Sequence, residues 1–89
     1  MDGAALVAWN LRRLRVSLGI SQEALGIDAK IDVSYVGRLE RGTENPTIGL
    51  LDRLSHVLGV HVSELLQEPD PLADPAPRLK PGRKPRGQR

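Results

Sequence analysis

The sequence predicts an all-α protein, a compact domain of five short helices within residues 1–66. Apolar residues recur at spacings of three and four, which is the period of one helix face. Glycines and cap-forming residues interrupt this pattern at short intervals, and the loops between them are two to five residues long. No segment alternates with period two for long enough to predict a sheet. Short loops between short helices are typical of a compact helical domain.

The first expected helix lies before Gly19. Its apolar face is formed, at spacings of four, three and four, by Val7, Leu11, Leu14 and Leu18. Gly19 ends it, because glycine readily takes the left-handed conformation just after a helix. Ser21 suits the N-cap of a short second helix, which turns Leu25 and Ala29 inward. Residues 30–31 then form a turn.

A third helix is expected between Asp32 and Gly42. Asp32 suits its N-cap, because a short carboxylate can accept a hydrogen bond from the first turn of a helix. Val36 and Leu39 lie three residues apart and would face inward. Gly37 in the middle of this helix costs roughly 1 kcal/mol relative to alanine, so its presence needs a reason.

The last two helices follow a loop at residues 43–46. Thr47 suits the N-cap of the fourth helix, and Gly59 ends it. Its apolar face is formed by Leu50, Leu51, Leu54 and Leu58. A fifth, short helix is expected over residues 62–66.

The composition excludes several classes of protein. The chain has 89 residues, a length that favours one domain. It has no cysteine, so it can form neither a disulfide nor a thiolate metal site. No apolar run approaches the roughly 20 residues of a membrane span, and the N-terminus lacks the pattern of a signal peptide. We therefore expect a cytoplasmic protein with no membrane contact.

The charge and the prolines divide the chain near residue 67. Residues 1–66 hold seven Arg or Lys against eight Asp or Glu, a net charge of −1, whereas residues 77–89 carry +6. Six of the seven prolines lie beyond Glu68, and proline can neither continue a helix nor join the interior of a sheet. We therefore expect a domain at residues 1–66 and a proline-rich, basic, disordered tail at residues 67–89.

The second and third expected helices, with the tight turn between them, form a candidate helix-turn-helix. Gly26 lies where the two helices would cross, and such a crossing needs a small residue. Ile31 and Val36 would fill the space between the helices. The outer face of the third helix, small and basic, is then formed by Val33, Ser34, Gly37, Arg38 and Arg41.

The stretches LRRLRVSLGISQEAL and VSYVGRLERGTENPTIGLLDRLSHVLGVHVSELL resemble the Cro/repressor (XRE-type) helix-turn-helix family. The resemblance covers about residues 5–66. Its most specific pieces are Ser21-Gln22-Glu23, Tyr35-Val36, Leu39-Glu40-Arg41-Gly42 and Asn45-Pro46-Thr47. Within the family, SYVGRLERGTENPTI is most similar to the controller proteins of restriction–modification systems, although phage-type repressors and antitoxins share most of these residues.

The resemblance implies a sequence-specific transcriptional regulator that binds double-stranded DNA. It implies that Gln22 contacts a phosphate and braces the third helix. Base edges would be contacted by Val33, Ser34 and Arg38, and phosphates by Arg41, Thr43 and Asn45. Arg15 and Glu40 match a structural ion pair between the first and third helices.

Simple chemistry supports these roles. Arg38 can donate two hydrogen bonds to O6 and N7 of guanine, and Val33 can pack on a thymine methyl group. Arg41 and the loop residues would hold the protein on the backbone without reading sequence. Gly37 would let the helix backbone approach the bases.

Lys30 departs from the family, which usually has glycine at this turn, so we expect either a positive φ at Lys30 or a different turn.

The resemblance also implies a homodimer on a palindromic operator, with half-sites about one helical turn apart. We expect the dimer interface in the apolar C-terminal end of the domain. It comprises Leu58, Val60, Val62, Leu65 and Leu66. The alternative is that all five belong to the core of one subunit.

Other readings remain open. His56 and His61 lack partners at metal-ligand spacing, so we expect no metal, no cofactor and no enzymatic activity. A protein-interaction module on the same scaffold, such as an antitoxin or antirepressor, is the alternative function, and it would act through the tail or the apolar end.

The ending PGRKPRGQR partly resembles the AT-hook, a minor-groove motif. Two alternatives to a minor-groove motif are open: the tail attracts DNA phosphates without reading sequence, or it only aids solubility.

Overall fold

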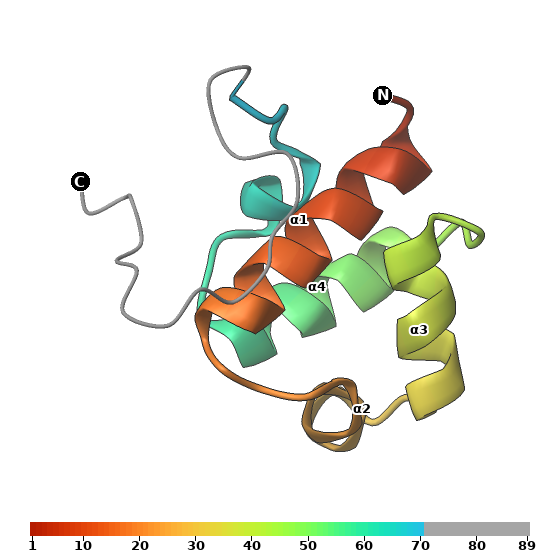
Figure 1. Ribbon diagram of the computed structural model, residues 1–89, viewed down its shortest axis with the longest axis vertical. Coiled ribbons are helices and arrows are strands. Elements are labelled where there is room, and N and C mark those ends of the chain that lie inside the picture. Colours follow the sequence, from red (N-terminus) through yellow and green to blue (C-terminus); the bar gives the residue numbers. More distant parts are fainter. Residues whose placement is uncertain (71–89) are drawn as a thin grey trace.

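The computed structural model describes residues 1–70, and this part of the chain contains helices and no strands (Figure 1). The α-helices are α1 (Gly3–Ser17), α2 (Gln22–Ala29), α3 (Val33–Arg41) and α4 (Ile48–Leu58), and they are followed by η1 (Val62–Leu66). The all-α class expected from the sequence is confirmed. The tail beyond residue 70 lies outside the described residues.

The fifth element is a 3-10 helix, so the expected count of five helices was slightly off: residues 1–70 contain four α-helices and one 3-10 helix. It has only 5 residues, and the residues on both sides of it, His61 and Gln67, are extended. The backbone N–H of Glu64 donates to the His61 carbonyl at 2.9 Å, three residues earlier. A segment this short favours the tighter 3-10 turn over a ladder of bonds to the fourth residue.

Capping side chains begin three helices where the sequence predicted them. Ser21, Asp32 and Thr47 each accept a hydrogen bond from a backbone N–H of the first turn, at 3.0–3.2 Å. Each bond satisfies a donor that the helix itself leaves unpaired. Gly42 and Gly59 end α3 and α4 in the left-handed conformation, with φ of 78° and 71°.

The turn between α2 and α3 is kept although Lys30 occupies it. Lys30 adopts φ 62° and ψ 45°, the only positive φ outside glycine in residues 1–70. The backbone N–H of Ile31 donates to the Gly26 carbonyl at 2.9 Å and closes the turn. Of the two possibilities that the sequence left open, the structure has the positive φ. The lysine therefore sits in a conformation that favours glycine.

Lys30→Gly is expected to raise the free energy of unfolding by about 0.5–1 kcal/mol. The substitution releases left-handed strain of about 1–2 kcal/mol. Part of that gain is lost, since glycine has more conformational freedom in the unfolded chain, worth roughly 0.5–1 kcal/mol. Urea unfolding checks the result, and exposed Asp28→Gly within α2 is the control, because glycine should destabilise a helix interior. A loss of stability in Lys30→Gly would contradict this account of the turn.

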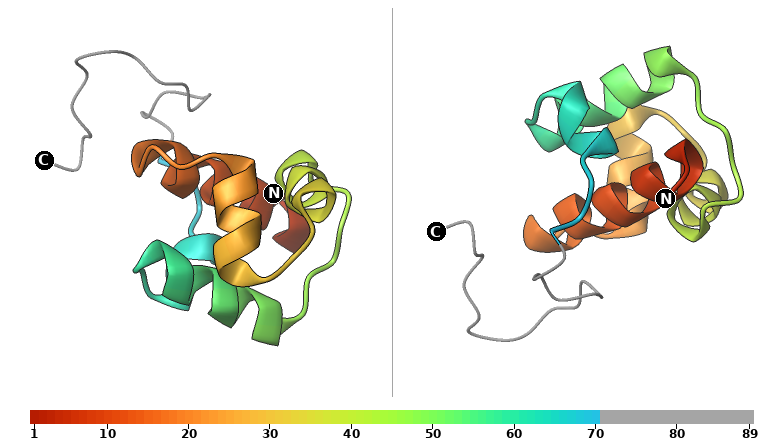
Figure 2. Two further views of the ribbon diagram at one scale, coloured as in Figure 1. Left: turned by 90° about the horizontal axis from the view of Figure 1, so that it is seen from below. Right: turned by 90° about the horizontal axis from the view of Figure 1, so that it is seen from above.

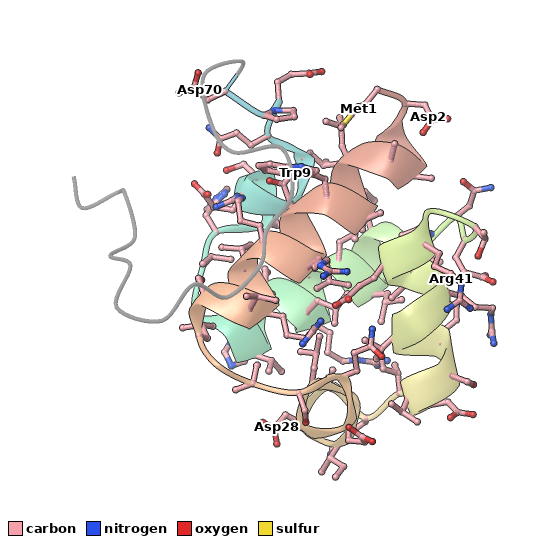
Figure 3. The ribbon with its side chains drawn as sticks, viewed as in Figure 1. Met1, Asp2, Trp9, Asp28, Arg41 and Asp70 are labelled. Atoms are coloured by element: carbon pink, nitrogen blue, oxygen red, sulfur yellow. The ribbon has the colours of Figure 1, made fainter. Side chains whose placement is uncertain are left out.

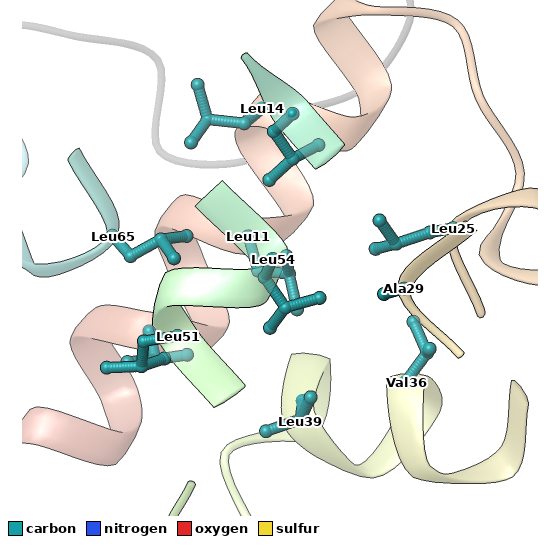
Figure 4. Close-up of a cluster of buried hydrophobic side chains, with 11 residues drawn as sticks. Leu11, Leu14, Leu25, Ala29, Val36, Leu39, Leu51, Leu54 and Leu65 are labelled. Carbon is teal, nitrogen blue, oxygen red and sulfur yellow. The ribbon is translucent and has the colours of Figure 1, made fainter. Parts of the chain in front are cut away.

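The core lies where all five elements meet, as Figure 4 shows. Its buried apolar side chains are Val7, Leu11, Leu14, Leu25, Ala29, Val36, Leu39, Leu51, Leu54, Leu58 and Leu65. These include nearly all the residues that the helical spacing placed inward, and Leu50 packs against the cluster from a half-buried position. Leu18 was wrongly placed on the apolar face of the first helix, because it follows the last residue of α1 and is 53% exposed. Within residues 1–70, no helix has both the length and the apolar character needed to cross a membrane.

Helices α2 and α3 pack directly against each other, and α3 lies on the side of the domain opposite η1 in all views (Figures 1 and 2). Gly26 is buried at their junction. A Cβ atom there would lie 2.9 Å from the Ile31 carbonyl oxygen, closer than side chains approach a backbone. Gly26 therefore permits the close packing that the sequence predicted for this crossing.

The segment after η1 is fastened to α1 by a buried amide. Asn10 is 0% exposed, and its Nδ2 donates to the carbonyl oxygens of Leu6 and Gln67, both at 2.9 Å. Arg13 donates to Asn10 Oδ1 at 2.8 Å. The contact with Gln67 joins two parts of the chain that are 57 residues apart.

Candidate nucleic-acid interface

Helix α3 presents one apolar side to the core and one polar side to solvent. Val36 and Leu39 are buried, whereas Ser34 and Arg41 are exposed and Val33 is 40% exposed. Asp32 starts the helix by accepting a hydrogen bond from the backbone of Ser34 at 3.2 Å. The exposed side is therefore free to contact a large partner, and its side chains include both donors and a small apolar residue.

Arg38 is held in place in the free protein. Its Nε donates to Oε2 of Glu44 at 2.8 Å, and its guanidinium carbon lies 5.4 Å from the centre of the Tyr35 ring. The side chain remains 44% exposed. Its terminal Nη groups carry further N–H donors, which is the arrangement needed to bind paired acceptors.

A buried carboxylate connects the first three helices. Glu40 of α3 accepts hydrogen bonds from Arg15 of α1 at 2.6 and 3.0 Å and from Nε2 of Gln22 at 3.0 Å. The side chains of Arg15 and Glu40 are 13% and 4% exposed. Arg15 also donates to the Ile20 carbonyl at 2.9 Å, in the loop before α2. The network fixes α3 relative to α1 and α2.

Gln22 is half-buried at the start of α2, and its amide group is a hydrogen-bond donor. One hydrogen of its Nε2 is used by Glu40. An amide nitrogen carries two hydrogens, so one remains for another acceptor. The first backbone N–H groups of α2 lie beside it, and helix N-termini favour anions.

Gly37 does not lie open on the outer face as the sequence suggested. It is buried. A Cβ atom at this position would lie 3.4 Å from Nη1 of Arg41 and 3.9 Å from Oε1 of Gln22. The side chains of Gln22 and Arg41 therefore cover Gly37 in the free protein, because no side chain at position 37 displaces them.

Gly37→Ala is expected to stabilise the fold by up to about 1 kcal/mol, because alanine is the better helix former. The nearest atom that a Cβ would meet is the end of the flexible Arg41 side chain. Binding to DNA should stay equal or weaken, since the methyl group occupies space beside Gln22 and Arg41. Thermal unfolding and duplex titration check the two parts, and tighter specific binding would contradict the second. Gly26→Ala is the matched control and should destabilise, because its Cβ would meet backbone.

The remaining predicted contact residues lie at the C-terminal end of α3 and in the loop after it. Arg41 projects outward from α3 (Figure 3), and Thr43 and Asn45 are exposed. The Thr43 hydroxyl donates to the Arg38 carbonyl at 3.2 Å. In the free protein Thr43 thus caps the helix. Arg41 and Asn45 carry donors in the exposed part of this end.

The predicted dimer residues divide into two groups. Leu58 and Leu65 are 4% and 0% exposed and belong to the core of the subunit. They leave no apolar surface for a partner, because side chains of the same subunit already enclose them. Val60 and Val62 are half-buried, and Leu66 is 41% exposed. Only these three leave apolar surface for a partner.

The sequence did not reveal the surroundings of Arg38. Glu44 lies six residues after Arg38, beyond the end of the helix, so helical periodicity does not pair them. Tyr35 is three residues before Arg38 and shares its side, which was the available signal. Within residues 1–70 no group of three His, Cys, Asp or Glu residues is placed to hold a metal ion.

Two short helices that pack through a glycine across a tight turn, the second with its polar side exposed, form a helix-turn-helix. Comparisons with known proteins agree. A helix-turn-helix family model matches residues 11–65. A curated relative, the uncharacterized HTH-type transcriptional regulator y4dJ of Sinorhizobium fredii, is 39% identical over 70 residues, which span 79% of this chain and 91% of that protein.

Solved structures of relatives have the same fold. The hypothetical transcription factor NHTF from Neisseria matches with a TM-score of 0.74 and 35% identity, over 76% of this chain and 78% of that one. The restriction-modification controller protein C.AhdI from Aeromonas hydrophila matches with a TM-score of 0.67 and 35% identity, over 70% and 94%. The chain belongs to the XRE-type helix-turn-helix family, whose members are DNA-binding transcriptional regulators and not enzymes.

Proposed function

We propose that this protein is a cytoplasmic, homodimeric regulator that reads a palindromic operator with α3 in the major groove. The observation that carries the proposal is the braced, solvent-facing side of α3. Val33, Ser34 and Arg38 supply an apolar contact, a hydroxyl and a guanidinium on one exposed helical side. These groups match a thymine methyl, several base acceptors or donors, and the acceptor pair of guanine.

Backbone phosphates would be bound at both ends of this surface. Gln22 offers its second amide hydrogen beside the N-terminus of α2. Arg41 and Asn45 are exposed at the other end of α3. Such contacts set the register of the protein on DNA, so that base reading is left to Val33, Ser34 and Arg38.

Selection of bound DNA from a randomised duplex pool tests this proposal. At about 150 mM salt, where non-specific phosphate binding is weakened, we expect enrichment of a palindrome with half-sites about 10 base pairs apart. Enrichment of a single half-site would contradict the proposed dimer but support the proposal that α3 reads bases. No enriched sequence would contradict the proposal and would favour a protein partner instead.

The dimer is proposed to form through Val60, Val62 and Leu66. Val60 and Val62 line an open hollow whose other walls include Asp52 and Arg53 of α4. Neighbouring opposite charges suit a two-fold interface, because each acid can face the base of the partner. The longest dimension of the domain is 30 Å, so two adjacent copies can space their α3 helices by about one turn of DNA, roughly 34 Å.

Sedimentation of the wild type and of Leu66→Glu tests the dimer. Leu66 is 41% exposed, so a charge there should leave the fold intact and yield a monomer. Leu18→Glu, at a leucine after α1 that is 53% exposed, is the control and should remain dimeric. A wild-type monomer at high micromolar concentration would contradict the interface.

A further inference from the structure

Glu44 stands on the side of the domain that the proposed function turns toward DNA, although a carboxylate there repels phosphate. Its Oε2 accepts the Nε hydrogen of Arg38 at 2.8 Å. The two side chains are 29% and 44% exposed. Solvent screens such a pair, so it contributes little to folding. The presence of Glu44 therefore calls for a role other than stability.

The backbone fixes Glu44 relative to Arg38. Gly42 ends α3 in the left-handed conformation and turns the chain back. The backbone N–H and the hydroxyl of Thr43 both donate to the Arg38 carbonyl at 3.2 Å. The residue that carries the carboxylate thus follows directly on one that is bonded to Arg38 itself. The helix end therefore keeps the backbone of Glu44 close to that of Arg38.

The pair leaves a defined part of the guanidinium free. Nε is occupied by Glu44, and the Tyr35 ring lies 5.4 Å from the guanidinium carbon. The guanidinium has five N–H donors in a rigid plane, so four remain on the two Nη atoms. Two of these can bind O6 and N7 of guanine end-on without breaking the bond to Glu44. Glu44 and Tyr35 together restrict the rotation of the Arg38 side chain.

We infer that Glu44 is a positioning residue that sets base specificity through Arg38. It holds the guanidinium ready for a guanine and lowers the affinity of the same surface for arbitrary DNA. This inference rests on the proposed function, because it assumes that Arg38 reads a base. Its consequence is that Glu44 acts on the ratio of specific to non-specific affinity and acts only while Arg38 is present.

A double-mutant cycle on Arg38 and Glu44 tests the inference. The probes are the duplex enriched by the wild type and a scrambled duplex of the same composition. Glu44→Ala should lower the affinity ratio between them about 3-fold, a fraction of the roughly 10- to 100-fold that a bidentate base contact contributes, and should bind the scrambled duplex more tightly. In the Arg38→Ala background, Glu44→Ala should leave the ratio unchanged. An equal fall in both backgrounds would overturn the inference.

Glu44→Gln separates position from charge. The amide oxygen of the glutamine can still accept the Nε hydrogen of Arg38. We therefore expect the ratio of the affinities for the two duplexes to return most of the way to the wild-type value, while binding to scrambled DNA stays as tight as in Glu44→Ala. A ratio as low in Glu44→Gln as in Glu44→Ala would overturn the positioning role. Thermal unfolding of each variant verifies that the fold is kept.

Glu64→Ala is the matched control. Glu64 faces Arg13, whose guanidinium carbon lies 5.4 Å from the Trp9 ring centre, so the same three kinds of group meet on α1 and η1, away from α3. The ratio should not change in Glu64→Ala. If Arg38→Ala lowers the ratio and Glu44→Ala does not, only the present inference fails. If the wild type enriches no sequence, both it and the proposed function fail.

Discussion

Glu40→Ala is expected to lower the free energy of unfolding by about 3 kcal/mol, because it leaves the Arg15 charge buried without its partner. The Glu40 side chain is 4% exposed and accepts bonds from both Arg15 and Gln22. For a domain of this size the melting temperature should fall by about 12–24 °C. Thermal and urea unfolding measure the effect.

The matched control is Glu64→Ala, which removes a carboxylate from a second Arg–Glu contact. Arg13 and Glu64 are 3.6 Å apart, and their side chains are 34% and 40% exposed. Exposed pairs contribute about 0–1 kcal/mol, so this variant should remain close to the wild type. A loss below about 0.5 kcal/mol in Glu40→Ala would show that solvent screens the Arg15–Glu40 pair as well.

Arg38→Ala is expected to weaken binding to the selected operator by about 10- to 100-fold, the range that a bidentate contact with one base provides. Binding to scrambled DNA should fall far less, because only one charge is lost from the surface. Fluorescence anisotropy with both duplexes at one salt concentration measures the difference. DNA selected by Arg38→Ala should also show no base preference at the position that Arg38 contacts.

Arg13→Ala is the control for that experiment. Arg13 resembles Arg38 in its surroundings, with an aromatic ring and a glutamate, yet it lies on α1 beside η1. Its loss should leave the ratio of the two affinities unchanged. An equal loss on both duplexes in Arg38→Ala would mean that Arg38 binds phosphates and does not read a base.

Local rules predicted most of the fold. Apolar spacing and caps such as Ser21 and Thr47 depend on residues within one or two turns, and the helices appear where these signals place them. Leu58 and Leu65 show the limit. Periodicity predicts that a residue is buried, but not whether its own subunit or a partner buries it. Here the core of the same subunit, between α1, α4 and η1, buries both leucines.

The candidate site was predicted as a set of positions but not as an arrangement. The face of α3 follows from spacing, so Ser34, Arg38 and Arg41 could be grouped from the sequence. The bond between Arg38 and Glu44 passes across a helix end, where spacing carries no information. Gly37 is covered in part by Gln22, which belongs to α2, so its burial depends on how α2 and α3 pack.

The bond from Asn10 to Gln67 has a consequence for where the folded unit ends. A gene cut after the codon for Leu66 would retain every helix, but the buried amide of Asn10 would lose an acceptor. An unsatisfied buried donor costs about 1–3 kcal/mol, a large share of the stability of a small domain. The shortest robust fragment for expression therefore extends through Gln67, one residue past the last turn of helix.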